Sequence, residues 1–197
     1  GLFAALTAAK SGKKILVIEQ TANWGGRAPV DGGEIAGQPV EKFVHECIFN
    51  LSSMENVEMR TRMMGAGVYD HGYLIAYERL SDHKPEAVGP RHRLWRIRAE
   101  KILTATGAIE RPLAFAENDK PGVLLASALR DYIANYSVAF GNRTVIVTNN
   151  DDAYLTAIIL KDAGLEVPAI IDARRNGAAD LGKKVKSMGI TVKAGKG

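Results

Sequence analysis

The first nineteen residues place the strongest constraint on the fold. The stretch "GLFAALTAAKSG" opens with a glycine and continues with helix-forming residues, and "ILVIE" then forms an apolar run that ends in an acid. A helix followed by such a run predicts a buried strand of a parallel sheet. In a dinucleotide-binding unit, the last glycine of a phosphate-binding turn opens the helix, and an acid about twenty residues later binds the ribose hydroxyls. Gly1 and Glu19 occupy these two places.

The same alternation of strands and helices continues along the chain. Helices are expected over residues 39–54, 125–136 and 152–164, with apolar strands at 101–112 and at three places after residue 142. Alternating elements predict an α/β fold, namely a two-dinucleotide-binding, flavoprotein-like architecture with Rossmann-type parallel sheets. We expect a first unit over residues 1–120, which carries a small antiparallel insertion at about 57–99. A second, degenerate unit is expected over 121–197, and both units look truncated at the outer ends of the chain.

Composition narrows the classes of function. No apolar run approaches the ~20 residues that a membrane helix requires, and the one cysteine, Cys47, excludes an internal disulfide framework. A reducing, cytoplasmic location is therefore expected. The formal charge is +4, and cations concentrate modestly in "RHRLWRIR" at residues 91–98. This pattern favours a strand with one solvated or subunit-facing basic face over a nucleic-acid site, so neither nucleic acid nor membrane is an expected partner.

Two further glycine-containing segments point to a nucleotide. Gly25 and Gly26 follow the acid closely and would let the backbone approach a cofactor, while Arg27 adds a cation that could meet phosphate. Thr106 and Gly107 end the expected strand "KILTATGA", where a residue without a Cβ would let the backbone pass a bound nucleotide. An ordinary flexible loop is the competing interpretation of the first segment, especially for Arg27.

The second unit lacks the glycines of a phosphate-binding turn. Its corresponding turn is "TNNDDAY", residues 148–154, which places two carboxylates at the start of a helix. An aspartate there is a good N-cap but repels phosphate. Asp172 ends the next expected strand, and without a phosphate turn a structural role for it is favoured over a ribose contact. The sequence therefore predicts at most one working dinucleotide site.

Other chemistry is sparse in the sequence. Cys47 stands alone, so a redox-active cysteine pair cannot form, and none of the four histidines has the spacing of a closed metal site. No catalytic residue and no metal site are predicted. The stretch "YDHGY" at residues 69–73 is unusual enough to be a site or an interface, with a tight turn at Gly72 as the alternative.

Several of these stretches resemble one family. "TATGAIERPLAFAENDKPGVLLASALRDYIANY" followed by "VTNNDDAYLTA" resembles the alpha subunit of heterotetrameric sarcosine oxidases, and "VYDHGYLIAYERLSDHKP" fits the same family. The resemblance extends over essentially the whole chain, and "GAIERP" and the glycine-free "TNNDDAY" are its most specific parts.

The resemblance implies a function. Members of this family oxidise the N-methyl group of sarcosine to give glycine, with oxygen as electron acceptor and hydrogen peroxide as product, and pass the methyl carbon to tetrahydrofolate. The alpha subunit carries NAD and a folate-binding domain, while the flavins, FMN and FAD, lie in the beta subunit or at the alpha–beta boundary. Partners would be the beta, gamma and delta subunits, of which a small one holds zinc. The carried-over cofactor residues are Gly1, Glu19, Gln20, Gly25, Gly26 and Arg27, with Met63, Met64 and Gly65 beside the adenine.

Three hypotheses stay open at this point. The first is a part of a sarcosine oxidase alpha subunit, serving as an NAD-carrying scaffold on which a flavin subunit docks. The second is a stand-alone oxidoreductase with FAD in the first unit and NAD(P)H in the second. The third is a purely structural domain. The residues do not separate NAD from FAD at the first site, because both nucleotides present a ribose to an acid.

Overall fold

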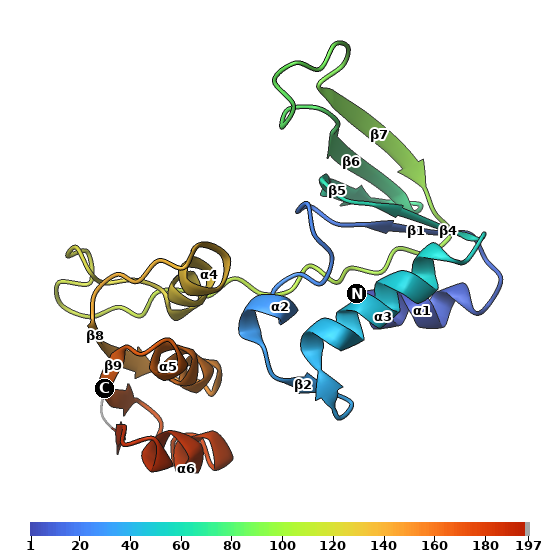
Figure 1. Ribbon diagram of the computed structural model, residues 1–197. Coiled ribbons are helices and arrows are strands. Elements are labelled where there is room, and N and C mark those ends of the chain that lie inside the picture. The colour runs from blue at the N-terminus through green and yellow to red at the C-terminus, as the bar shows by residue number, and fades with distance from the viewer. Residues whose placement is uncertain (196–197) are drawn as a thin grey trace. The chain divides into compact units, whose positions relative to one another are not determined.

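The computed structural model describes residues 1–195. The chain divides into two compact units, Gly1–Gly107 and Ala108–Gly197. The boundary expected from the sequence lies at residue 120, so residues 108–120 lie in the second unit rather than the first. Figure 1 shows the elements of both units along the chain.

A parallel strand pair with two helices forms the base of the first unit. The elements are α1 (Leu2–Ala9), β1 (Ile15–Ile18), α3 (Val40–Ser52) and β4 (Val57–Arg60). β1 and β4 pair in parallel, and α3 is the crossover between them. α1 and α3 lie side by side, and the rings of Phe3 and Phe43 stack with centroids 6.4 Å apart (Figure 1). The loop between β1 and α3 contains the short elements α2 (Ala28–Asp31), β2 (Glu34–Ile35) and β3 (Gln38–Pro39).

The buried face of α3 confirms the helical spacing seen in the sequence. Its four buried residues are Val40, Val44, Cys47 and Leu51. They are separated by three or four positions, which places them on one side of a helix. This face, rather than intrinsic helix propensity, fixes α3 against the strand pair.

A three-stranded antiparallel sheet forms the rest of the first unit. Its strands are β5 (Met63–Tyr69), β6 (Tyr73–Arg79) and β7 (His92–Arg98), in that order across the sheet. It begins at Met63 rather than at residue 57, because Val57–Arg60 finds a parallel partner in β1. The predicted insertion is therefore shorter at its start, and its first strand belongs to the parallel layer.

Glu78 joins this sheet to β4 from the buried side. The side chain is only 6% exposed, and its Oε2 accepts a hydrogen bond of 2.7 Å from Trp95 Nε1. Arg60 on β4 donates to Oε1 at 3.3 Å and lies 5.0 Å from the centre of the Trp95 ring. A buried carboxylate is stable only with such partners, so the three side chains stabilise one another.

The segment after β7 differs from the sequence expectation. Residues 101–112 carry an apolar run that predicts a strand, but residues 101–115 form neither helix nor strand. Leu103 is 71% exposed and Ile109 is 92% exposed. A strand needs a neighbour that takes its hydrogen bonds, and β1 and β4 pair with each other rather than with this segment. The apolar run therefore stays extended without a ladder.

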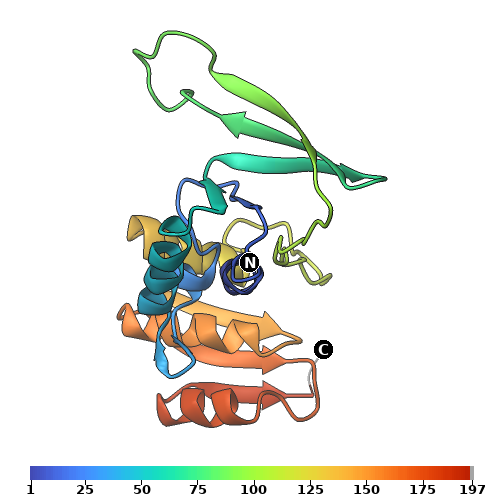
Figure 2. The ribbon, with the colours of Figure 1, turned by 90° about the vertical axis from the view of Figure 1, so that its right-hand side faces the viewer.

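The second unit is a parallel sheet with helices between its strands. The elements are α4 (Ala126–Tyr136), β8 (Arg143–Thr148), α5 (Asp152–Asp162), β9 (Glu166–Asp172), α6 (Asp180–Ser187) and β10 (Thr191–Ala194). The strand order is β10-β9-β8, so both crossovers step in the same direction. Right-handed crossovers then place α5 and α6 on one side of the sheet, as Figure 2 shows. The α/β fold class with parallel sheets is confirmed.

The core of the second unit forms where α5 packs on the sheet. Tyr154, Ala157 and Leu160 of α5 are almost fully buried, and Ile170 of β9 is 0% exposed. α4 is connected to the preceding segment by Glu110, whose Oε2 accepts a hydrogen bond of 2.7 Å from the Ser127 N–H. The carboxylate thus satisfies one of the backbone donors at the start of that helix.

The hairpin turn between β5 and β6 gives a test of the first unit. Gly72 has φ +67, and a Cβ there would lie 1.9 Å from the Ala99 carbonyl oxygen. We expect Gly72→Ala to destabilise the unit by about 2–4 kcal/mol, because it adds a backbone clash to a strained φ. Urea unfolding followed by tryptophan fluorescence measures the change, since both tryptophans, Trp24 and Trp95, lie in the first unit.

Gly12→Ala is the matched control. Gly12 has φ +75, but a Cβ there meets no heavy atom within 4 Å. It should cost only about 1 kcal/mol, from the backbone conformation alone. Equal losses in the two variants would contradict the clash at Ala99.

Candidate cofactor-binding site

The carboxyl end of β1 brings together several of the predicted residues. The Glu19 N–H donates to the Arg60 carbonyl at 2.9 Å, and the Met63 N–H donates to the Glu19 carbonyl at 2.8 Å. β1, β4 and the start of β5 therefore meet at Glu19. In open parallel sheets, ligands bind at the carboxyl ends of the strands, so Glu19 lies at the edge where a ligand is expected.

Local hydrogen bonds orient the Glu19 carboxylate. Its Oε1 accepts from the Thr21 N–H at 2.9 Å and from the Thr21 hydroxyl at 3.0 Å. Gln20 is exposed, and its carbonyl accepts from Arg79 at 2.9 Å. The carboxylate of Glu19 is half-buried and held in place by its own turn. Among the described residues both of its hydrogen bonds reach Oε1, which leaves Oε2 as an acceptor for a hydroxyl.

The start of α1 carries the donors of an anion site and no opposing charge. The Gly1 carbonyl accepts the first helical hydrogen bond from the Ala5 N–H at 2.9 Å, and the first turn contains no acidic residue. The backbone N–H groups of a first turn have no partner within their helix, and the helix dipole favours an anion there. A Cβ on Gly1 would lie 3.5 Å from the Ala105 Cβ. Gly1 and the "TATG" segment are therefore neighbours, as the sequence interpretation requires.

The loop of Gly25, Gly26 and Arg27 packs on α3. Gly25 has φ +108, and a Cβ there would lie 3.0 Å from Val44 Cγ1. Gly26 has φ +57 with open space around it. The Arg27 guanidinium forms an ion pair with Asp31 at 3.1 Å. The glycine pair thus has a structural reason, and contact of Arg27 with phosphate stays a prediction.

The remaining predicted residues lie either in β5, as Met63, Met64 and Gly65 do, or in the segment after β7, as Thr106 and Gly107 do. Met63 is 0% exposed while the adjacent Met64 is 46% exposed, as the alternation of a strand requires. A Cβ on Gly65 would lie 3.7 Å from Ile18 Cδ1, so the backbone of β5 passes close to β1. Thr106 and Gly107 are exposed and do not end a buried strand. Their role beside a cofactor stays a prediction.

The turn "TNNDDAY" in the second unit is filled by ion pairs. Asp151 pairs with Arg174 at 2.7 Å. Asp152 accepts hydrogen bonds from both terminal nitrogens of Arg130, a side chain that is only 1% exposed. The expected side-chain cap differs in detail, because Asn150 Oδ1 accepts from the Ala153 N–H at 3.4 Å and Asp151 makes no capping bond. The side chains of Asp151 and Asp152 therefore bind arginines instead of capping the backbone N–H groups of α5.

Asp172 has a structural role in the same network. It is 0% exposed and accepts hydrogen bonds from the Tyr154 hydroxyl at 2.8 Å, from the Arg174 N–H at 2.9 Å and from the Arg174 guanidinium. Burial opposes its ionisation, but the bonds from Arg174 and Tyr154 outweigh burial and lower the pKa of Asp172. Burial, and then the bond to Asp172, raise the pKa of Tyr154. The oxygens of Asp172 are thus engaged within the protein, as the structural interpretation of this acid expects.

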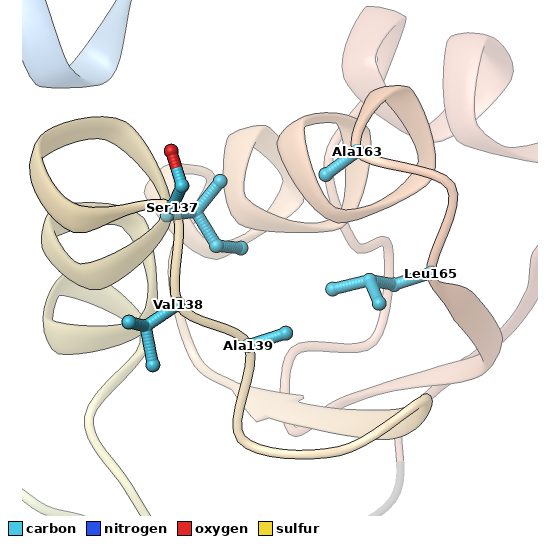
Figure 3. A pocket seen from close by; sticks show the side chains of 6 residues that line it. Ser137, Val138, Ala139, Ala163 and Leu165 are labelled. Carbon is cyan, nitrogen blue, oxygen red and sulfur yellow. The ribbon is translucent and has the colours of Figure 1, made fainter.

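One small pocket lies in the second unit and is lined by none of the predicted site residues. Its volume is about 260 Å³, and it is lined by Ile133, Ser137, Val138, Ala139, Ala163 and Leu165. Figure 3 shows Ser137, Val138 and Ala139 on one side and Ala163 and Leu165 on the other. None of these side chains is titratable, so the pocket offers no acid, base or metal ligand.

Among residues 1–195, no group of three or more His, Cys, Asp or Glu side chains could hold a metal ion. None of the helices in that range is long and apolar enough to cross a membrane.

The stretch "YDHGY" is a tight turn. His71 and Gly72 both have positive φ, and the Gly72 carbonyl accepts from the Ala99 N–H at 2.9 Å. The sequence did not predict the ion pairs of Asp151 and Asp152, because each aspartate is far in sequence from the arginine that it binds. Only the presence of two unpaired-looking acids in "NNDD" hinted that cations would be needed.

Comparison with known proteins gives a consistent family. The chain is 40% identical over 188 residues to the sarcosine oxidase subunit alpha of Rhizobium meliloti, which covers 94% of this chain. It is 37% and 33% identical to the corresponding subunits of two Corynebacterium strains, P-1 and U-96. The resemblance to sarcosine oxidase alpha subunits is confirmed. The chain spans 19–20% of the length of these alpha subunits, and no family model matches it.

Solved structures agree on the fold. L-proline dehydrogenase from P. horikoshii superposes with a TM-score of 0.66 at 24% identity, covering 87% of this chain and 33% of that one. The HOCl-induced flavoprotein disulfide reductase of Escherichia coli gives a TM-score of 0.58 at 15% identity, over 98% of this chain and 46% of the reductase. The water-forming NADH oxidase of Lactobacillus brevis gives 0.55 at 12% identity, over 98% and 43% of the two chains. The chain therefore shares the fold of these three oxidoreductases.

The Asp172 network predicts limits of pH for the second unit. A lowered folded-state pKa of Asp172 contributes stability above the ordinary aspartate pKa of about 3.9, and this is lost as pH falls through the folded value. A raised pKa of Tyr154 contributes stability that is lost as pH rises above about 10. Amide hydrogen exchange of β9 peptides should therefore show maximal protection between these limits.

Two variants separate the limits. Asp172→Asn should lower the free energy of unfolding by about 2–4 kcal/mol and abolish the acid limit, because it removes the buried charge that Arg174 and Tyr154 stabilise and leaves Arg174 with Asp151 as its remaining ion-pair partner among the described contacts. Tyr154→Phe should abolish the alkaline limit and move the acid limit to higher pH, because the Tyr154 hydroxyl also lowers the pKa of Asp172. Wild type and variants are compared at the same pH, so that intrinsic exchange rates cancel. An unchanged acid limit in Asp172→Asn would show that another group causes it.

Proposed function

We propose that this chain is the dinucleotide-carrying part of a sarcosine oxidase alpha subunit, with NAD bound by its first unit. The observation that supports the proposal most is a contrast between α1 and α5. Each of these helices is followed by a parallel strand with an acid at its end, Glu19 after β1 and Asp172 in β9. The first turn of α1 carries no acid, whereas α5 begins with Asp151 and Asp152. A pyrophosphate fits the first helix start and is repelled by the second.

The residues of the first unit have distinct tasks in this proposal. The backbone N–H groups after Gly1 bind the pyrophosphate, and Glu19 accepts hydrogen bonds from the ribose hydroxyls through Oε2. Bound NAD supplies the adenosine, the charged pyrophosphate and a nicotinamide ring that can accept hydride. The residues proposed to border it further are Gln20, Gly25, Gly26, Arg27, Met64, Gly65, Thr106 and Gly107.

The reaction proposed for the whole enzyme is the oxidative demethylation of sarcosine. Sarcosine, oxygen and tetrahydrofolate give glycine, hydrogen peroxide and methylene-tetrahydrofolate. The flavins, FAD and FMN, belong to the beta subunit or its boundary with the alpha subunit, and the gamma and delta subunits complete the assembly in the cytoplasm. This chain contributes the scaffold against which the flavin-bearing subunit packs, and we assign no substrate-contacting residue to it.

Three alternatives to this proposal make different predictions. FAD could occupy the first unit, since it too presents a ribose and a pyrophosphate. A stand-alone FAD- and NAD(P)H-dependent oxidoreductase has support from the structural neighbours, but it needs a nucleotide site in the second unit. There, Arg130 and Arg174 hold the carboxylates of Asp151 and Asp152 in the phosphate turn. A purely structural role requires that no nucleotide be bound at all.

The identity of the released nucleotide tests the proposal. The full-length protein, purified with its partner subunits, is denatured, and the supernatant is analysed by chromatography and mass spectrometry. We expect NAD in a stoichiometric amount to the subunit. FAD alone from this site, or no pyridine nucleotide, would overturn the proposal.

Glu19→Ala tests the ribose contact. Loss of a charge-assisted hydrogen bond costs about 1.5–3 kcal/mol, so NAD should bind about 10–100-fold more weakly. Isothermal titration of the nucleotide-stripped complex measures the change. Glu100→Ala is the control, because Glu100 is exposed and pairs only with Lys13 at 2.9 Å among the described contacts. The same loss in both variants would remove Glu19 from the site.

A further inference from the structure

The antiparallel sheet of the first unit has one buried face and one exposed face. The cross-strand register places Tyr77 opposite Leu94, Tyr73 opposite Arg98 and Tyr69 opposite Tyr73. Directly paired residues point to the same side of a sheet. We define the outer face by Tyr69, Tyr73, Tyr77, Leu94, Arg96 and Arg98. The opposite face contains the buried Met63, Ala76 and Glu78.

A β-bulge creates this face. The register shifts between Gly65 and Gly67, so that Ala66 is an extra residue in β5. Without the bulge, the period of two would place Tyr69 on the side of Gly65, which faces β1. With it, Tyr69 lies beside Tyr73, at a ring-centre distance of 5.9 Å. The bulge thus adds an aromatic residue to the outer face.

Large apolar side chains on this face are exposed at two places. Leu94 is 64% exposed, Tyr69 56% and Tyr77 36%. Tyr77 and Leu94 lie directly opposite each other, and Tyr69 lies opposite Tyr73 beside the β5–β6 hairpin. Single exposed apolar residues are normal, but several on one face of a sheet form a patch of the kind that binds a partner. The patch consists of rigid side chains on a paired sheet, so little side-chain entropy is lost when it is covered.

The charge of the outer face has one sign. Arg96 Nε donates to the Tyr73 hydroxyl at 3.1 Å, and the Arg98 guanidinium lies 4.8 Å from the centre of the Tyr73 ring. Both guanidinium groups are therefore held by one tyrosine. The sequences of β5, β6 and β7, all within the described residues, contain a single acid, Glu78, and it lies on the buried face. The outer face offers cations and no carboxylate.

These properties favour a protein as the occupant. Interfaces between proteins are enriched in tyrosine and arginine, whereas a domain core excludes guanidinium groups. The same register places Arg79 and His92 on this face beyond Tyr77 and Leu94. The Arg79 guanidinium donates to the Gln20 carbonyl at 2.9 Å, and the His92 ring stacks on Tyr77 with centroids 5.0 Å apart. Nucleic acid needs a continuous stripe of cations, whereas here Tyr77 and Leu94 separate Arg96 and Arg98 from Arg79 and His92. A complementary partner surface would place carboxylates opposite Arg96 and Arg98 and apolar side chains opposite Tyr77 and Leu94.

We propose that the outer face of the β5–β6–β7 sheet is the docking surface for another subunit, through a partner surface that carries carboxylates opposite Arg96 and Arg98 and apolar side chains opposite Tyr77 and Leu94. The relatives are named as alpha subunits, which agrees with a partner in the same enzyme. The inference rests on the proposed function in this respect only. It assigns a place on the chain to the contact, which the proposed function does not.

Charge reversal tests the cationic end. Arg96→Glu/Arg98→Glu is introduced into the full-length subunit, and binding to the purified cognate subunits is measured by analytical ultracentrifugation at two salt concentrations. We expect dissociation constants at least tenfold higher and a weaker dependence on salt than in the wild type. Lys184→Glu/Lys186→Glu is the matched control, because it makes the same change of charge on exposed positions of α6. It should leave both quantities unchanged.

A second measurement does not depend on a variant that folds. Hydroxyl-radical footprinting compares the oxidation of Tyr69, Tyr77 and Leu94 in the full-length subunit and in the complete complex. We expect at least threefold protection of all three on assembly, and no change at the exposed Phe49 of α3. Protection already present in the separate subunit would mean that another part of the same polypeptide covers the face, and would overturn the proposal.

Other outcomes also decide the matter. Self-association that disappears in the Arg96/Arg98 variant would assign the face to a second copy, and heparin or DNA binding without an effect on assembly would assign it to a polyanion. Both overturn the proposal. The NAD content of each sample separates this inference from the proposed function. An assembly that depends on the face but lacks NAD overturns only the cofactor, whereas an NAD-containing assembly indifferent to the face overturns only the docking surface.

Discussion

The guanidinium of Arg174 holds together the carboxyl end of the second parallel sheet. It binds Asp151, at the start of α5, and Asp172, at the end of β9. Both carboxylates bind the same guanidinium, which offsets the repulsion between them. Tyr154 adds its hydroxyl to Asp172 from the first turn of α5. The strand, the turn and the helix of this unit therefore depend on one ion-pair network.

The corresponding part of the first unit, at the start of α1 and the end of β1, has no such ion-pair network among the described residues. Its corresponding helix begins at Gly1 with no acid in the first turn, and its strand-end acid, Glu19, is oriented by Thr21 rather than by an arginine. The two units therefore differ in the partners of their acids: the carboxylates at the start of α5 and the end of β9 pair with arginines, whereas Glu19 is held by the backbone and hydroxyl of Thr21.

Much of the secondary structure could be predicted from the sequence, because it depends on local patterns of residues. The period of α3, the apolar strands of the second unit and the glycine-free turn all follow from spacing and residue type. The strand expected at residues 101–112 did not form, since an apolar run specifies burial but not a hydrogen-bonding neighbour. The partners of Asp151 and Asp152 could not be predicted either, because they come from other segments of the chain: Arg130 lies 22 residues from Asp152, and Arg174 follows the next strand after Asp151.

The sequence by itself determined the fold class and the resemblance to sarcosine oxidase alpha subunits, because helix formers, apolar strands and turn residues act over a few residues. Only the tertiary structure decided which acids form ion pairs with arginines and which face of the β5–β6–β7 sheet is exposed. An ion pair needs two groups brought together from distant segments, and one bulged residue, Ala66, reverses the side to which Tyr69 points. Neither effect leaves a periodic trace in the residues themselves.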